Sequence, residues 1–249
     1  MRRGKIVATL MALVLLGPVQ AREWIAVGAA FPRIFEEDGR GGFTGLGPAV
    51  LERVLQARGD RVRFLLYPWS RAQRMVSNGE ADILIGPYAT PERRQRWGFS
   101  RLPFYRDVIQ FYGRTDRLPD WQGDYRRLAG LRVALVRGWT YGDRFRSESA
   151  ALDPSPVENV TNGLRMLGAG RIDLLAANAR HTDLDLRALG LQGRIVPIAP
   201  PIDAQDGYFA FPRDAEHDAL RATLDQALTA LRDDGSLARL AEGLGVTVP

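Results

Sequence analysis

The sequence predicts an α/β protein with two lobes joined by a hinge of two crossover strands. Short apolar runs alternate with amphipathic segments of helical spacing, which is typical of crossover units and a mainly parallel sheet. This series occurs twice, and its two copies join near Phe111 and again near Tyr208. The first lobe is therefore expected to be discontinuous (22–112 and 208–249), with 113–207 as the second lobe. A cleft beside such a hinge is where ligands tend to bind.

Apolar runs of the first series predict strands at 24–28, 62–67 and 82–86, and the segments between them predict helices at 45–58 and 70–78. Leu51, Val54 and Leu55 fall on one face of the first helix, and Gly79 stops the second. A further apolar strand at 107–113 has no helix after it. The polar segment 114–122 that follows contains Pro119, as expected for a crossover to another lobe.

The second series repeats this alternation. It predicts strands at 132–136, 157–160, 172–176 and 195–198, and helices from about 141, at 163–167 and at 183–189. A loop at 199–206 holds Pro200 and Pro201, and a returning strand follows at 207–211. Helices at 215–232 and 235–244 are expected to complete the first lobe.

The first 21 residues have the pattern of a secretory signal peptide. Arg2, Arg3 and Lys5 form a basic start, an apolar run occupies 6–16, and 19–21 reads as a cleavage site. The alternative is a membrane anchor, but the run is well short of the ~20 residues that span a bilayer. No cysteine follows it for lipid attachment. We therefore expect a soluble mature chain in the periplasm, without a lipid anchor.

The composition excludes several classes of protein. The chain has no cysteine, which rules out disulfides, zinc–thiolate sites and cysteine nucleophiles. Three of the 34 basic residues lie in the signal peptide, which leaves 31 against 29 acidic residues and a net charge of +2. Arginines alternate with acids throughout, so nucleic-acid binding is not expected. No catalytic, metal-binding or cofactor motif is evident, and no cofactor is predicted.

Residues 68–100 (PWSRAQRMVSNGEADILIGPYATPERRQRWGFS) form the most informative segment. A helix ends at a glycine, a short apolar strand follows, and a turn then carries Arg93, Arg94 and Arg96. Such a turn suits the capture of an anionic small molecule, because a guanidinium offers parallel donors that match a carboxylate. For Arg93 the alternative is a surface arginine paired with Glu92 or Asp107. The other two arginines are expected to face solvent.

With these residues in view, the chain resembles the bacterial extracellular solute-binding proteins of family 3, the periplasmic receptors of polar amino-acid ABC importers. The resemblance covers nearly all of 22–249. It is carried by FTGLGPAVLERVL (43–55), PWSRA (68–72), GEADILIG (79–86), TPERR (90–94) and GRIDLLAAN (170–178). It implies the type II periplasmic-binding-protein ("Venus flytrap") fold and a ligand bound between the lobes. It also implies a partner in the inner membrane, either an ABC permease or a sensor.

The resemblance also assigns ligand-binding roles. Arg93 corresponds to the arginine that forks onto the ligand carboxylate, and Thr140 to a threonine of the second lobe that holds the same group. The remaining positions are implied to line the cleft or to contact the rest of the ligand: Phe31, Trp69, Gly86, Tyr88, Trp139 and Tyr141. Residues 138–141 (GWTY) are expected between a strand and a helix N-terminus, where backbone N–H groups can hold an anion.

One position departs from the family. Asn178 stands where amino-acid binders carry an aspartate that neutralises the ligand ammonium, and an amide supplies no charge. Either Asp206 or the pair Glu36/Glu37 takes over this role, or the ligand is not a standard α-amino acid. We favour the second interpretation.

The competing hypothesis is an enzyme, since some proteins on this scaffold are dehydratases that use an acid in the cleft. His181 and His217 lie outside the predicted cleft turns and are expected at the surface, and no elbow motif supports a Ser-His-Asp site in which Ser70 or Ser100 meets one of them. The prediction is therefore a receptor for a small carboxylate-bearing ligand, with a dehydratase-like enzyme or a ligand sensor as the alternatives.

Overall fold

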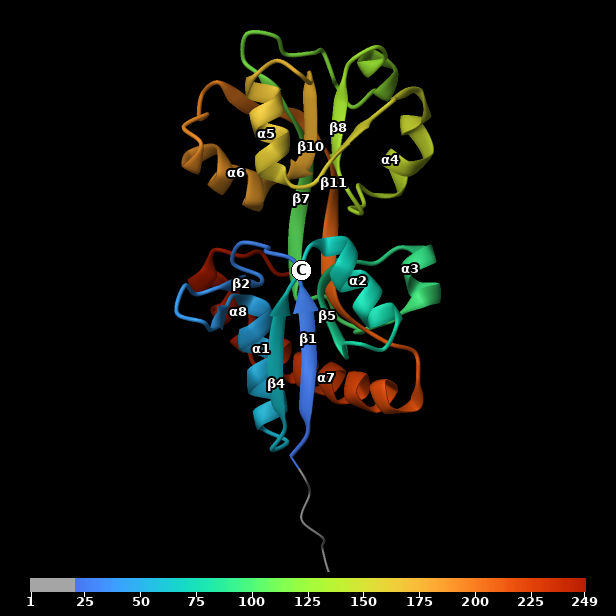
Figure 1. Cartoon of the computed structure of the whole chain (residues 1–249), viewed down its shortest axis with the longest axis vertical. Helices are drawn as coiled ribbons and strands as arrows, with labels where there is room; N and C mark the ends of the chain where they lie inside the picture. The colour runs from blue at the N-terminus through green and yellow to red at the C-terminus, as the bar shows by residue number, and fades with distance from the viewer. Residues whose placement is uncertain (1–20) are drawn as a thin grey trace, which may run out of the picture.

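The computed structural model describes residues 21–249, and its chain forms two lobes bridged by two long strands (Figure 1). These strands are β7 (Tyr105–Arg114) and β11 (Ile195–Phe211), which pair antiparallel along most of their length. The main strands form one sheet in the order β4-β1-β5-β11-β7-β10-β8-β9, and β6 (Gly98–Phe99) pairs with β11. The predicted two-lobed α/β fold with a hinge of two crossover strands is confirmed.

In the first lobe, β1 (Glu23–Gly28) pairs in parallel with both β4 (Arg61–Leu66) and β5 (Ile83–Tyr88). Figure 1 shows α1 (Leu46–Gln56) and α8 (Ser236–Leu244) on one side of these strands, and α2 (Trp69–Ser77) and α3 (Pro91–Arg96) on the other. The long helix α7 (Ala215–Asp233) packs against α8, and β2 (Glu36–Glu37) and β3 (Phe43–Thr44) form a small hairpin.

In the second lobe, β8 (Val133–Val136) lies between β9 (Ser155–Val157) and β10 (Leu174–Asn178), with parallel pairing to both. The helices are α4 (Asp143–Glu148), α5 (Val160–Gly168) and α6 (Ala179–Ala188), with two 3-10 turns, η1 (Tyr125–Leu128) and η2 (Ser149–Ala151). Buried Leu164, Leu167 and Leu175 form part of a core between α5 and the sheet.

Three boundaries differ from the sequence prediction, each for a local reason. Residues 199–206 belong to β11 and do not form a loop. The prolines lie where the pairing of β11 with β7 shifts register, between Ile198 and Asp203, and strands tolerate proline at such an irregularity. Helix α6 begins at Ala179, four residues earlier than predicted, because Asn178 caps it. Helix α5 begins at Val160, which the sequence assigned to a strand, because Asn159 caps it.

The lobe boundaries predicted at 112/113 and 207/208 stay predictions, although Ile109 to Tyr112 already pair with β10 of the second lobe. The predicted signal peptide falls almost entirely outside the described residues. Within 21–249, no helix combines the length and apolar character needed to cross a bilayer.

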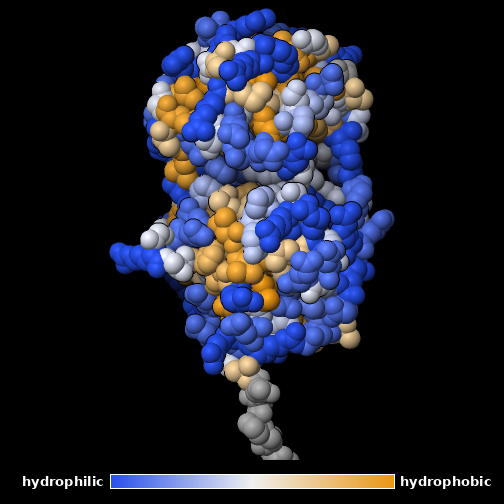
Figure 2. All heavy atoms as spheres, in the orientation of Figure 1, coloured by the Kyte–Doolittle hydropathy of each residue, from blue (hydrophilic) through white to orange (hydrophobic). Residues whose placement is uncertain are grey.

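Figure 2 shows a mainly hydrophilic face with a hydrophobic band over β1 and β4 of the first lobe. There the edge strand β4 carries the exposed Arg61 and Arg63, which discourage pairing with a second sheet.

Candidate functional site

Seven residues that the sequence assigned to the ligand site surround one small cavity between the lobes. We call them the interlobe cluster: Phe31, Trp69, Gly86, Tyr88, Arg93, Trp139 and Thr140. The cavity leaves about 10 Å³ for solvent, roughly the space of one water molecule. Its lining does not include the other two predicted residues, Tyr141 and Asn178. The ligand-binding role of all nine stays a prediction.

Arg93 is the charged centre of the cluster. Thr90 caps α3 and accepts a hydrogen bond from the Arg93 backbone N–H (3.2 Å), which places the side chain on the buried side of this short helix. The guanidinium donates from Nη1 to the Tyr88 carbonyl (2.9 Å) and from Nη2 to the Gly138 carbonyl of the other lobe (2.7 Å). Its carbon lies 5.9 Å from the centroid of the Trp69 ring, a cation–π distance.

The charge of Arg93 has no counterion. Arg93 is only 9% exposed, and no carboxylate of residues 21–249 lies within ion-pair distance of it. The proposed partners are engaged elsewhere, since Glu92 pairs with Arg146 and Asp107 with Arg180. Burial lowers the pKa of Arg93 to about 10, so the side chain still carries its charge at neutral pH. The surface-arginine interpretation is therefore wrong, and a buried cation without an anion favours the binding of one.

Aromatic side chains from both lobes enclose this charge. Phe31 packs edge-on against Trp69 (5.4 Å between centroids) and against Trp139 of the second lobe (6.0 Å). The Trp69 indole N–H donates to the same Gly138 carbonyl that Arg93 uses (3.0 Å). Gly138 has φ 74, and a Cβ there would lie 3.3 Å from the Trp69 ring, so glycine allows this close approach of the loop.

The 138–141 loop differs from the sequence expectation. Helix α4 begins at Asp143, so Thr140 lies in the loop and not at a helix N-terminus, and the Trp139 N–H is bonded to the Val136 carbonyl (3.1 Å). Tyr141 is buried, and its hydroxyl oxygen accepts a hydrogen bond from the Val136 backbone N–H (2.6 Å), which fixes the loop against β8. The Thr140 hydroxyl is buried without a partner among the described residues.

A buried ion pair behind the cluster was missed by the sequence reasoning. Arg180 of α6 contacts Asp107 of β7 through two bonds, Nε to Oδ1 at 2.9 Å and Nη2 to Oδ2 at 2.8 Å. The Tyr88 hydroxyl donates to the same carboxylate (2.7 Å), and Arg180 also donates to the Pro32 carbonyl of the first lobe. The side chains of Asp107 and Arg180 are 1% and 9% exposed. The available signal was an acid, Asp107, that shares the alternation of the apolar residues Ile109 and Phe111 and so falls on the inward face of its strand.

Asn178 has a structural role in this conformation. Its Oδ1 accepts the His181 backbone N–H (2.9 Å) at the start of α6, while its Nδ2 is buried without a partner among the described residues. The acids considered as substitutes for the family aspartate are held elsewhere. Asp206 makes two bonds to Arg106 (2.6 and 2.9 Å), and Glu36 accepts the Arg33 backbone N–H (2.9 Å). Glu37 is exposed on β2.

Both histidines are more buried than the sequence suggested, so their prediction as surface residues is wrong. His217 is 8% exposed and lies between Asp82 and Asp214, at 2.9 and 2.6 Å, away from the cluster. The His181 side chain is 14% exposed and contacts Trp139, with 6.4 Å between ring centroids. Helix α6 begins earlier than predicted, which brings His181 to the cleft.

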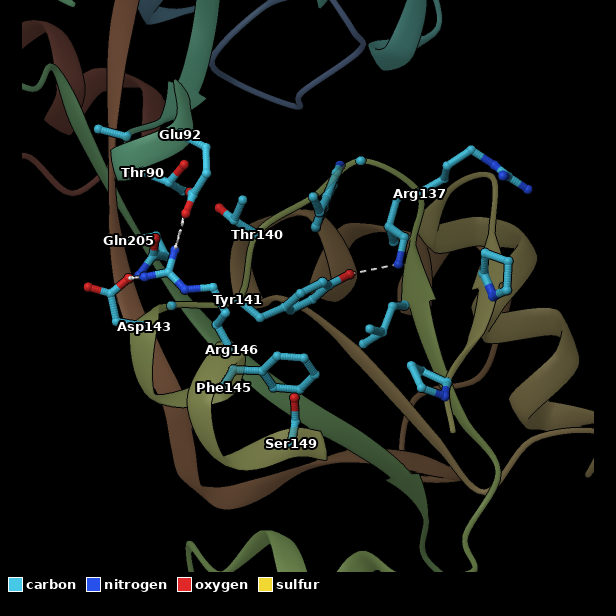
Figure 3. Close-up of a pocket in the computed structure, with 18 residues that line it drawn as sticks. Thr90, Glu92, Arg137, Thr140, Tyr141, Asp143, Phe145, Arg146, Ser149 and Gln205 are labelled. Atoms are coloured by element: carbon cyan, nitrogen blue, oxygen red, sulfur yellow. Dashed lines mark hydrogen bonds and ion pairs between the residues drawn. The ribbon is translucent and has the colours of Figure 1, made fainter. Parts of the chain in front are cut away.

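Two larger cavities flank the interlobe cluster. One of about 680 Å³ lies between α3, α4 and the 138–142 loop, and Figure 3 shows Thr90 and Glu92 on its first-lobe side. Tyr141 and Phe145 form part of its apolar wall, and Gln205 of β11 reaches it as well. The other, of about 360 Å³, is lined by Phe31, Trp69 and His181 among others. Trp139 lines these two cavities and the small cavity of the interlobe cluster, so it lies where the three spaces adjoin.

Comparison with known proteins identifies the family. The sequence profile of the bacterial extracellular solute-binding proteins, family 3, matches residues 25–244. The chain belongs to this family. Its members are binding proteins, so the chain is a solute-binding protein, which supports the receptor prediction over the dehydratase alternative. Membership also implies a secreted or periplasmic protein.

Individual relatives agree with this assignment. The chain is 26% identical over 227 residues to the probable amino-acid-binding protein YxeM of Bacillus subtilis (strain 168), covering 87% of this chain and 81% of that one. Among solved structures, a histidine kinase sensor domain with similarity to periplasmic binding proteins has a TM-score of 0.81 at 24% identity, covering 92% and 99% of the two chains. An ancestral arginine-binding protein bound to arginine has a TM-score of 0.76 at 16% identity, covering 89% and 97%.

The burial of His181 predicts a pH dependence of stability. Burial lowers its pKa from the ordinary 6.5, although Asp185 opposes the shift. The His181 side chain therefore takes up a proton more readily in the unfolded chain than in the folded one. The stabilisation that neutral His181 contributes to the folded state is complete above pH 6.5, and it is lost as the pH falls through the pKa of His181 in the folded protein. Urea unfolding at neutral and mildly acidic pH should show a smaller acid-induced loss of free energy for His181→Gln than for the wild type. Equal acid-induced losses of the free energy of unfolding in the two proteins would contradict this prediction.

Proposed function

We propose that this solute-binding protein captures a small carboxylate-bearing ligand between its lobes and delivers it to an ABC importer in the inner membrane. One observation carries the proposal: a nine-tenths-buried guanidinium, Arg93, lies between the lobes with backbone carbonyls as its hydrogen-bond partners. A carboxylate would supply the missing negative charge and match the two parallel donors of the fork. Relatives with amino-acid ligands support this class of solute.

Binding would proceed by exchange of hydrogen bonds. The Gly138 carbonyl currently accepts from both Arg93 and Trp69, which ties the second lobe to the first. A ligand carboxylate would take the Arg93 donors and leave Trp69 to hold the loop. The Thr140 hydroxyl, buried without a partner in the described residues, would donate to the same carboxylate from the second lobe. Both lobes would then contact one anion, which couples binding to closure.

The remainder of the ligand would lie among the aromatic residues. Phe31, Trp69 and Trp139 already contact one another across the lobes. Trp139 lines the small cavity and the two larger ones, and a shift of this side chain would enlarge the small cavity toward a space that suits a small organic molecule. The family ligand positions Gly86 and Tyr88 would form the first-lobe wall.

A sensor is the second candidate for the downstream partner. It is favoured by the fold similarity to a histidine kinase sensor domain, which covers nearly all of both chains. In either case closure of the lobes would be the signal that the membrane partner reads. Uptake of the labelled ligand by cells lacking the gene distinguishes the two. Loss of uptake is expected for an importer, whereas unchanged uptake with a lost transcriptional response would favour the sensor.

A ligand screen tests the proposed function. Thermal unfolding should be followed with small organic acids, amino acids, opines, short peptides and uncharged sugars, and hits confirmed by titration calorimetry. We expect stabilisation by one or more carboxylates at one site per chain, and weaker binding of the same compound to Thr140→Val. Stabilisation by sugars alone, or binding of the best acid that is unaffected in both Thr140→Val and Arg93→Ala, would contradict the proposal.

A further inference from the structure

We propose that the ligand of the interlobe cluster is an anion without an ammonium group, such as a keto acid or a simple carboxylic acid, and not a zwitterionic amino acid. This inference rests on the proposed function and narrows its ligand class. It follows from which hydrogen-bonding groups of the cluster are already engaged by the protein, and from the charge that remains.

The backbone acceptors of the cluster already bind protein donors. The Gly86 carbonyl accepts from the Tyr105 hydroxyl (2.7 Å), and the Tyr88 carbonyl accepts from Arg93 (2.9 Å). The Gly138 carbonyl accepts from Arg93 and from Trp69. An ammonium needs acceptors for its three N–H groups. The cluster therefore offers an ammonium few acceptors and offers an anion the donors of Arg93 and Thr140.

The nearest buried acid is also engaged. Asp107 receives two bonds from Arg180 and one from Tyr88, so all three donors would have to be displaced before an ammonium could use it. Its side chain is 1% exposed. Asn178, at the position of the family aspartate, is neutral, and its oxygen caps α6. The acid that would balance an ammonium is therefore neutralised within the protein.

The charges around the cluster leave an excess of one positive charge. Two guanidiniums, Arg93 and Arg180, face one carboxylate, Asp107. Three groups nearby are neutral at pH 7, because burial raises the pKa of Tyr88 and Tyr105 and lowers that of His181, and the neighbouring Glu92 is paired with Arg146. A ligand with one net negative charge complements this site, whereas a zwitterion would bring an ammonium that stays uncompensated in a desolvated space.

Matched pairs of compounds test the inference on the wild-type protein. Each pair shares a side chain and differs in the amine: phenylpyruvate and phenylalanine, ketoisocaproate and leucine, ketoglutarate and glutamate. By titration calorimetry we expect the amine-free member of the binding pair to bind at least about tenfold more tightly, which equals about 1.4 kcal/mol. If no pair shows this order, the inference fails.

A variant of Arg180 provides a second, independent readout. Arg180→Gln removes the cation that neutralises Asp107, so the ratio of affinities within a pair should shift about tenfold toward the amino acid. Arg187→Gln, on the exposed side of the same helix, is the matched control and should leave the ratio unchanged. An unchanged ratio in folded Arg180→Gln would contradict the role of the ion pair. Acid binding that is unaffected by Arg93→Ala would instead contradict the proposed function.

Discussion

Replacement of Arg93 by alanine is expected to weaken binding of the carboxylate ligand by at least about 100-fold, because truncation of a buried charged hydrogen-bond partner costs about 2–5 kcal/mol. Arg93→Lys should lose about tenfold, since an ammonium keeps the charge but not the planar fork. Stability should respond differently. Removal of a 9% exposed cation without a counterion relieves a desolvation cost, so the free energy of unfolding without ligand should change by only about 1 kcal/mol.

This separation of affinity from stability distinguishes a binding role from a structural one. Calorimetric titration gives the first quantity and urea unfolding the second. Arg96→Lys is the matched control, because Arg96 lies on the exposed face of the same short helix, with its guanidinium near the Trp97 ring. It should leave both quantities unchanged. A large loss of stability in Arg93→Ala with unchanged affinity would assign Arg93 to holding the lobes together.

Most of the fold could be predicted because its signals are local. The apolar runs that gave β1, β5 and β8 need no distant partner to be recognised. Residues 199–206 were predicted as a loop because of their prolines, but whether a proline interrupts a strand depends on the backbone hydrogen bonds that the neighbouring strand makes at that position. Here the register of β11 shifts against β7 at that point and leaves room for them.

The candidate site was predicted only as far as single positions allow. The Thr90-Pro91-Glu92-Arg93 order contains a helix cap and a proline at the first turn, and these place Arg93 toward the cleft. The engagement of Asp107 by Arg180 could not be inferred, since the two residues are 73 positions apart and are brought together by the antiparallel pairing of β7 with β10, in which Ile109 lies opposite Asn178. The capping role of Asn178 was overlooked because its helix was predicted to begin too late.

Breaking the Asp107–Arg180 pair should give the largest loss of stability. Asp107→Asn leaves the Arg180 guanidinium buried without its counterion, and Arg180→Met leaves the Asp107 carboxylate buried with the Tyr88 hydroxyl as its remaining side-chain donor. Each single change is expected to lower the free energy of unfolding by about 3–5 kcal/mol. The double variant should lose less than the sum of the two, with a coupling of about 2–3 kcal/mol, because neither charge is then left alone. Urea unfolding of all four proteins at neutral pH measures this cycle.

The exposed pair Arg106–Asp206 is the internal control. It has similarly short contacts, from 2.6 to 2.9 Å, but its side chains are 44% and 25% exposed. Water screens both charges there, so Arg106→Met should cost about 1 kcal/mol or less. The expected difference in stability loss between the Asp107–Arg180 pair and the Arg106–Asp206 pair follows from burial, since the contact distances of the two pairs are similar. Additive single effects at Asp107 and Arg180, or a loss no larger than at Arg106, would mean that burial gives this pair no more coupling than an exposed pair has.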